Sequence, residues 1–331
     1  MDNSPLLECL SPAKINIRLK VVRKREDGYH DLDSIMVPIN LWDLLQFYRA
    51  PEGEIYLKCK GKPLPCSENN LVFRAAQAFF SASHVKGGID IRLIKAIPIA
   101  AGLGGGSSNA AITLTALNRI FGNPLEASKL WLIAKELGAD VPFFLDPKPS
   151  IARGIGHVLL PIKNWPLFWY VIFVPPIEVS TSWVYGQLKL GLTKKSLPDI
   201  FNYLKREDFQ ISLLLENDLE AVTVAAYPEI AAIKALFQKL GAEGTLMSGS
   251  GPSVFALFKS REEALGAAKT IKWAKKGEVF VVTQWNSPIA HQKRFAAGVS
   301  SSGKTRAFGA RIRRFESSHP SHFLCGNEPE S

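Results

Sequence analysis

The stretch "PIAAGLGGGSSNAA", residues 98–111, places four glycines within five positions and then continues with residues that favour a helix. Glycines let a backbone approach a ligand closely, and the free amides at the start of a helix favour a phosphate group. The stretch lacks the third glycine of the dinucleotide-binding fingerprint and the Gly-Lys-Ser/Thr end of a P-loop. It therefore indicates a phosphate-binding loop of another type, with a flexible hinge as the alternative.

The first strand is the clearest element upstream of this loop. Apolar residues at 13, 15, 17, 19 and 21 alternate with Lys14, Asn16, Arg18 and Lys20. A period of two predicts a strand with one face in the core and a second, cationic face.

The segments on either side of the loop predict a mixed α+β unit. Strands are expected at residues 32–41, 54–59 and 88–99, and helices at 70–81, 107–121 and 125–137. Asn69 or Asn70 is a plausible cap of the first helix, and Gly138 ends the third. This order lacks the regular alternation of a doubly wound sheet.

The second half predicts a smaller α/β sandwich. Strands are expected at 168–174, 254–258 and 278–283, and helices around 211–215, 230–240 and 261–271. Because a chain of 331 residues is too long for one ordinary core, we expect two domains, residues 1–158 and 159–290. Residues 291–331 carry seven Lys or Arg against three Glu and predict a disordered basic tail.

Charge and cysteine usage narrow the function classes. A net charge of +10 suits nucleotides and also nucleic acid, but the basic tail lacks interleaved stacking aromatics, so we expect no nucleic acid partner. The four cysteines form no CxxC pair, which argues against a zinc site or disulfides and fits a reducing cytoplasm. The apolar run at 165–174 is too short to span a membrane, and we find no leader sequence, so we expect a cytoplasmic protein without membrane association.

Two charged residues and a second glycine motif suit the phosphate loop. Asp140, in "GADVPFF", could cap the next short helix, and a strand lysine such as Lys14 is usually solvated. Beside a phosphate loop, however, a carboxylate and a cation are what phosphoryl transfer to a hydroxyl needs. "SGSGPS", residues 248–253, indicates either an anion nest facing the first loop or a tight strand-to-helix turn.

Five segments together resemble the galactokinase, homoserine kinase, mevalonate kinase and phosphomevalonate kinase (GHMP) superfamily. They are "SPAKINIRLKV", "DGYHDLDSIM", "PIAAGLGGGSSNAA", "LGADVPFFL" and "SGSGPSVFALF". Within the superfamily they are similar to the family of kinases that act on 4-diphosphocytidyl-2-C-methyl-D-erythritol. The resemblance covers roughly residues 8–290 and implies the two-domain GHMP-kinase fold, with an N-terminal ATP-binding domain.

The resemblance also implies an activity. A kinase of this family transfers the γ-phosphate of ATP, with Mg²⁺, to the 2-hydroxyl of its cytidine-diphosphate substrate in the non-mevalonate isoprenoid pathway. Asp140 is then the general base, and Lys14 stabilises the charge that develops on the hydroxyl. Another GHMP kinase, acting on mevalonate or homoserine, is the alternative, and a non-catalytic sensor on this fold is disfavoured because both residues are present.

The binding residues carried over by resemblance fall into two groups. Those expected at ATP are Lys95, Pro98, Gly102, Leu103, Gly104, Gly105, Gly106, Ser107 and Ser108. Lys95 and the side chains around Leu71 border the adenine, and Ser107 or Ser108 lies near the metal. Those expected at the small-molecule substrate are Asn16, Tyr29, His30, Thr181, Tyr185 and Ser250. The chain is expected to be a monomer or homodimer.

Three positions depart from the family pattern. "TSWVY" carries Ser182 and Tyr185 where the family has Pro and Phe, which weakens the stacking role of Tyr185 on cytosine, and His157 stands where the family has an acidic residue. His30, expected to read the cytosine edge, could instead be a turn histidine bonded to backbone, and Tyr29 could be a half-buried aromatic.

Overall fold

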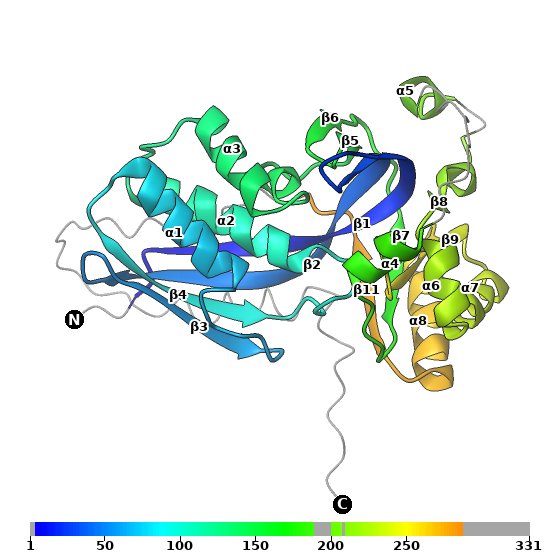
Figure 1. The fold of residues 1–331 in the computed structure, drawn as a ribbon. Helices are drawn as coiled ribbons and strands as arrows, with labels where there is room; N and C mark the ends of the chain where they lie inside the picture. Colours follow the sequence, from blue (N-terminus) through cyan, green and yellow to red (C-terminus); the bar gives the residue numbers. More distant parts are fainter. Residues whose placement is uncertain (1–3, 189–199, 207–208, 287–331) are drawn as a thin grey trace, which may run out of the picture.

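The computed structural model describes residues 4–188, 200–206 and 209–286, and contains two sheets with helices on their outer faces (Figure 1). The predicted tail at 291–331 lies outside the described residues. The first sheet has the order β3-β4-β2-β1-β8, with β5 pairing with β2 and β6. Its strands are β1 (Leu7–Lys24), β2 (His30–Ala50), β3 (Ile55–Gly61), β4 (Gly88–Lys95), β5 (Ser150–Gly154), β6 (Val158–Pro161) and β8 (Glu216–Asn217). Its helices are α1 (Leu71–Ser83), α2 (Gly105–Ile120), α3 (Ala127–Leu137) and the 3-10 turn η1 (Pro142–Leu145).

The second sheet is antiparallel, with the order β11-β7-β10-β9. Its strands are β7 (Trp169–Val174), β9 (Gly244–Met247), β10 (Val254–Phe258) and β11 (Glu278–Thr283). Its helical elements are α4 (Thr181–Gln187), α5 (Ile200–Tyr203), η2 (Ile211–Leu214), α6 (Glu220–Ala226), α7 (Glu229–Lys239) and α8 (Arg261–Ala274). The mixed α+β organisation in two units is therefore as predicted.

Alternation along β7 explains how the two units are joined. Tyr170 and Ile172 face a core that contains Ile15 and Ile35 of the first sheet, whereas Val171 and Phe173 face the helices α7 and α8. Because successive strand residues point to opposite faces, one buried strand serves both cores. The two sheets thus share an apolar layer.

The register between β1 and β2 changes at the point where the side chains of β1 change face. The pairing shifts between Pro12 and Ala13, where the register passes over residues 40 and 41 of β2. Cys9 accordingly packs under the helices, whereas Ala13 packs in the layer between the sheets. Lys14 therefore points to the helix-covered side.

One prediction about secondary structure is wrong, and the polar residues of β1 are buried. Lys14, Asn16 and Arg18 are only 4%, 3% and 5% exposed. The helix expected at 211–215 is one 3-10 turn, after which the chain becomes extended and β8 pairs in parallel with β1. The apolar run before β8 has no clear period, so it could not separate a helix from a buried strand.

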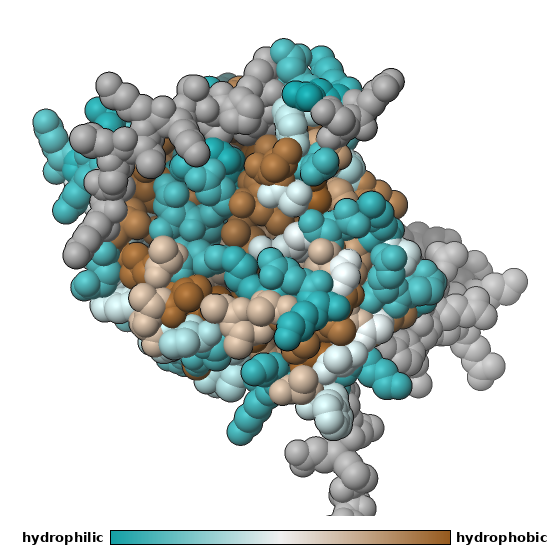
Figure 2. Space-filling model, turned by 90° about the vertical axis from the view of Figure 1, so that its right-hand side faces the viewer, coloured by the Kyte–Doolittle hydropathy of each residue, from teal (hydrophilic) through white to brown (hydrophobic). Residues whose placement is uncertain are grey.

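Among the described helices, none is both long and apolar enough to cross a bilayer. Figure 2 shows hydrophilic and hydrophobic residues interspersed on the face that it displays. The described cysteines, Cys9, Cys59 and Cys66, are free.

Candidate functional site

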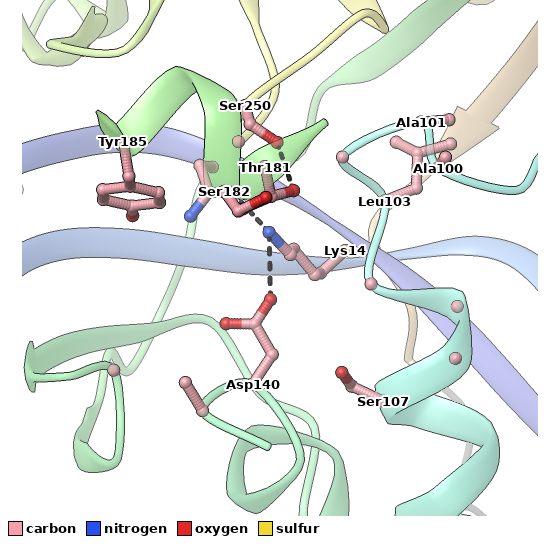
Figure 3. A pocket seen from close by; sticks show the side chains of 18 of the residues that line it. Lys14, Ala100, Ala101, Leu103, Ser107, Asp140, Thr181, Ser182, Tyr185 and Ser250 are labelled. Carbon is pink, nitrogen blue, oxygen red and sulfur yellow. Dashed lines mark hydrogen bonds and ion pairs between the residues drawn. The ribbon is translucent and has the colours of Figure 1, made fainter. Parts of the chain in front are cut away.

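One cavity of about 940 Å³ collects the predicted residues from both units. Its wall includes β1, the glycine loop before α2, the segment before η1, helix α4 and the loop between β9 and β10 (Figure 3). Every residue that the sequence assigned to the site lines this cavity except Ser108. A volume of this size is at the upper end for ligand sites and suits two ligands better than one.

The glycine loop needs glycine for two separate reasons. Gly102 and Gly104 have φ angles of +75° and +70°, a conformation that other residues rarely adopt. A Cβ on Gly102 would overlap the carbonyl oxygen of Ser248, and one on Gly104 would lie 2.9 Å from the ring of Phe144. The loop is tied to β1 because the amide of Lys14 donates to the carbonyl of Leu103 at 2.9 Å.

Helix α2 begins two residues earlier than predicted, at Gly105. The first bond of the helix runs from the Ser108 amide to the Gly104 carbonyl at 2.9 Å, so the amides of Gly105, Gly106 and Ser107 have no acceptor within the helix. The first turn contains no acidic residue. These amides form a site of partial positive charge at the cavity wall.

The two serines of the loop have different surroundings. Ser107 lines the cavity, whereas Ser108 is fully buried and accepts a hydrogen bond from the Ser11 hydroxyl at 2.7 Å. Of the two hydroxyls expected near a metal, that of Ser107 is the one at the cavity wall.

Asp43 is a buried residue that holds the start of α2 in place. The sequence patterns did not identify this role. Its buried carboxylate accepts from the Lys95 ammonium at 2.5 Å, from Asn109 Nδ2 at 2.9 Å, and from the amides of Ala96 and Ile97 at 2.7 and 2.8 Å. The amides of Ala96 and Ile97 donate to Asp43 and not to a neighbouring strand. For this reason β4 ends at Lys95 and does not continue to residue 99 as predicted. The available signal was an Asp inside the apolar run "NLWDLLQF".

Lys95 lies against the first residue of α2. A Cβ on Gly105 would be 2.7 Å from the Lys95 Nζ. Burial lowers the pKa of Lys95, and the neighbouring Asp43 carboxylate opposes that shift. Lys95 is therefore a buried support of the loop as well as part of the cavity wall.

Lys14, Asn16 and Asp140 form the charged centre of the cavity. The Lys14 ammonium lies 2.5 Å from Asn16 Oδ1 and 3.4 Å from Asp140 Oδ2 (Figure 3). The capping alternative for Asp140 is wrong, because the N-cap of η1 is Val141 and no side chain caps it. The alternative of a solvated Lys14 is also wrong, since the residue is buried.

The second glycine motif contacts the first directly. Ser248 Oγ accepts from the amide of Asn16 at 3.3 Å and donates to the carbonyl of Gly102 at 3.0 Å. One hydroxyl thus joins the strand that carries Lys14 to the phosphate loop. The motif connects the antiparallel strands β9 and β10, so the strand-to-helix alternative is wrong.

An aromatic pair lies at the other end of the cavity. The rings of His30 and Tyr185 are 5.1 Å apart and inclined by 30°, and Tyr29 beside them is 57% exposed. Burial lowers the pKa of His30, and the nearby Lys24 lowers it further. Burial and the charge of Asp140 raise the pKa of Tyr185.

Helix α4 carries two of the residues that were predicted to bind the substrate, Thr181 and Tyr185. Thr181 Oγ1 is 2.8 Å from Ser250 Oγ, which ties α4 to the second glycine motif. Ser182, which stands where the family has Pro, also lines the cavity, and its hydroxyl is 2.9 Å from that of Ser180. His157 does not line it, and its ring packs 5.8 Å from that of Trp131.

Comparisons with known proteins agree with this geometry. Residues 70–146 match the family described as GHMP kinases N terminal domain, and residues 198–272 match GHMP kinases C terminal. The 4-diphosphocytidyl-2-C-methyl-D-erythritol kinase of Syntrophus aciditrophicus (strain SB) is 48% identical over 260 residues, which cover 78% of this chain and 92% of that protein.

Solved structures show the same fold. A 4-(cytidine 5'-diphospho)-2C-methyl-D-erythritol kinase superposes with a TM-score of 0.68 and 33% identity, covering 85% of this chain and 100% of that chain. A homoserine kinase from Cytophaga hutchinsonii, at 19% identity, a TM-score of 0.66 and coverage of 88% and 97%, shows the fold alone. The predicted two-domain GHMP-kinase fold is confirmed. The chain belongs to the GHMP kinases, which depend on ATP, and within them to the 4-diphosphocytidyl-2-C-methyl-D-erythritol kinase family.

Proposed function

We propose that this chain transfers the γ-phosphate of ATP to the 2-hydroxyl of 4-(cytidine 5'-diphospho)-2-C-methyl-D-erythritol. The observation that carries the proposal is the position of the Lys14–Asp140 pair. In Figure 3 it lies between Ser107, at the start of α2, and Tyr185, which packs on His30. A proton acceptor and a cation thus separate a phosphate-binding helix end from an aromatic site for a base.

The phosphates of ATP bind the free amides of Gly105, Gly106 and Ser107. Each amide donates a hydrogen bond to an anionic oxygen, and the helix dipole adds to the attraction. Gly102 and Gly104 allow the backbone to approach the phosphates without a Cβ in the way. Leu71 and Pro98, which also line the cavity, border the adenine.

Asp140 and Lys14 perform the chemistry at the hydroxyl. The carboxylate accepts the hydroxyl proton as the oxygen attacks phosphorus, and the ammonium stabilises the negative charge that develops on that oxygen. Asn16 holds the ammonium in place through its side-chain oxygen.

His30 and Tyr185 bind the cytosine. A neutral imidazole has one donor and one acceptor, which matches the amino group and the ring nitrogen or carbonyl on the cytosine edge. The lowered pKa of His30 favours this neutral form. Tyr185 offers a ring face for stacking, and Thr181 and Ser250 offer hydroxyls to the rest of the substrate.

The described residues fit an ion that arrives with the nucleotide. They contain no group of three His, Cys, Asp or Glu that could hold a metal by themselves. Mg²⁺ in kinases is held largely by phosphate oxygens and water, and it neutralises phosphate charge. The hydroxyl of Ser107 is the protein oxygen that we assign to it.

The predicted domain limits, 1–158 and 159–290, belong to the same proposal. Separate sheets support them, although β6 begins at residue 158 and the short β8 of the second half pairs with β1. The free cysteines support a reducing cytoplasm as the setting.

The test is an ADP-release assay with purified protein, ATP and Mg²⁺. The cytidine-diphosphate substrate is compared with mevalonate and homoserine at equal concentrations. We expect turnover with the cytidine compound alone. Turnover of mevalonate or homoserine without turnover of the cytidine compound would overturn the proposal.

A further inference from the structure

Lys24 extends the cavity wall next to the aromatic pair. It is the last residue of β1 and pairs in register with His30, the first residue of β2. It lines the same cavity as Tyr185 and Ser250. Its positive charge acts on the cavity at His30, because it contributes to the lowered pKa of that residue.

The neighbours of Lys24 have acidic partners. Arg23 Nε lies 2.5 Å from Asp31, and Arg25 contacts both Asp27, at 2.8 Å, and Asp31, at 3.2 Å. Both carboxylates are therefore occupied by the two arginines. Within the described part of the chain, Lys24 has no hydrogen-bonding or acidic partner.

The other lysines of the cavity wall are also neutralised. Lys14 pairs with Asp140, and Lys95 pairs with Asp43. Among the described residues that line the cavity, Lys24 is thus the one cation without a carboxylate. Lys24 is exposed, and an uncompensated ammonium beside a binding cavity attracts an anion.

We propose that Lys24 binds the diphosphate of the cytidine-diphosphate substrate. The inference rests on the proposed function, since it needs a nucleoside diphosphate at the His30–Tyr185 end of the cavity. ATP is the other source of phosphate, but its phosphates belong at the start of α2. Figure 3 shows Lys14 and Asp140 between the start of α2 and Tyr185. The ring of Tyr185 packs on His30, which pairs with Lys24 across the two strands.

The experiment compares binding of CDP and of cytidine to the full chain by calorimetry. Lys24→Gln removes the charge, Lys24→Arg keeps it, and Lys163→Gln is a control that removes one positive charge at an exposed residue outside the cavity. We expect Lys24→Gln to weaken CDP binding about fivefold, the size of one partly exposed ion pair, and to leave cytidine binding unchanged. Lys24→Arg and Lys163→Gln should bind CDP as the wild type does.

Kinetics separate the two sources of phosphate. With Lys24→Gln, KM for the cytidine substrate should rise about fivefold, while KM for ATP and kcat stay within twofold of wild type. Unchanged CDP binding, an equal loss of cytidine binding, or an effect on KM for ATP instead would overturn the inference. If the wild type turns the substrate over and Lys24→Gln has the same KM for it, only the role of Lys24 is refuted. If the wild type shows no turnover, the proposed function is refuted.

Discussion

The Lys14 ammonium and the Asp140 carboxylate lie 3.4 Å apart although they come from different layers of the first domain. Lys14 is on strand β1, and Asp140 is on the turn that links α3 to η1. The register shift between Pro12 and Ala13 accompanies a change of face that leaves Lys14 toward the helices, and Gly138 ends α3 just before Asp140. The pair therefore depends on two local breaks in regular structure.

Asp140→Asn should abolish most turnover. The amide has nearly the same shape as the carboxylate but cannot accept the hydroxyl proton, so we expect kcat to fall roughly 10²–10⁴-fold with KM for ATP nearly unchanged. Steady-state kinetics with both substrates would show this. Asp146→Asn is the control, because Asp146 is an exposed acid that pairs with Lys148. A kcat near wild type in Asp140→Asn would remove Asp140 as the base.

Ser34 should control catalysis through Asn16. Ser34 Oγ donates to the carbonyl of Arg18 at 2.6 Å, so it must accept from Asn16 Nδ2, at 2.9 Å. This direction fixes the Asn16 oxygen toward the Lys14 ammonium, since an ammonium can only donate. In Ser34→Ala the amide loses this restraint, and we expect kcat to fall about fivefold, the worth of one hydrogen bond, with KM for ATP unchanged.

Conservative variants test whether the Ser34 effect is one of orientation. Ser34→Thr keeps the hydroxyl and should restore most of kcat. Ser150 lies on the neighbouring strand β5, and its buried hydroxyl donates to the carbonyl of Lys148. Ser150→Ala should leave kcat at the wild-type level. If Ser34→Ala and Ser150→Ala have the same kcat, the hydroxyl of Ser34 does not orient Asn16.

The residues that local sequence could identify are those in short, regular patterns. Alternation revealed β1, and the glycine loop preceded a helix as predicted, because strand period and glycine conformation are local properties. The direction of Lys14 was not predictable, because the change of face accompanies a register shift that exists only when β1 pairs with β2.

Residues that act through distant contacts were beyond the sequence patterns. Asp43 joins β2 to α2 over 66 positions of sequence, and Ser248 meets Gly102 from the other domain. No propensity or spacing encodes such a pair. Lys24 is a similar case, because its lack of a carboxylate partner depends on the contacts of Arg23 and Arg25 with Asp31.

His30 should make cytidine binding pH-dependent only on the acidic side. Burial and Lys24 lower its pKa from the usual 6.5, so the ring stays neutral at pH 7 and becomes protonated only below 6.5. Protonation removes the acceptor needed at the cytosine edge. Cytidine affinity should therefore be constant from pH 8 to 6.5 and fall below that value, a trend that calorimetry at several pH values would reveal.

The same shift affects stability in a defined direction. The folded state binds fewer protons than the unfolded one, so the contribution of His30 to stability is full above the unfolded pKa and is lost as pH falls below it.

His30→Gln has no titrating ring and should flatten the acidic fall in cytidine affinity. A fall of equal steepness in His30→Gln would assign the pH dependence to another group.

Gly102→Ala should destabilise the fold more than the backbone angle alone explains. Gly102 has a φ of +75°, and a new Cβ would also overlap the Ser248 carbonyl across the interface of the two glycine loops. Gly241 has a similar φ of +83° with nothing within 4 Å of the added carbon, so Gly241→Ala measures the conformational penalty by itself, about 1 kcal/mol. The unfolding free energy from urea titration should fall by that amount in Gly241→Ala and by roughly 2–3 kcal/mol in Gly102→Ala. Because the clash pushes the two glycine loops apart, KM for ATP should rise in Gly102→Ala and not in Gly241→Ala. Equal losses of unfolding free energy in both variants would mean that the two loops do not need their close approach.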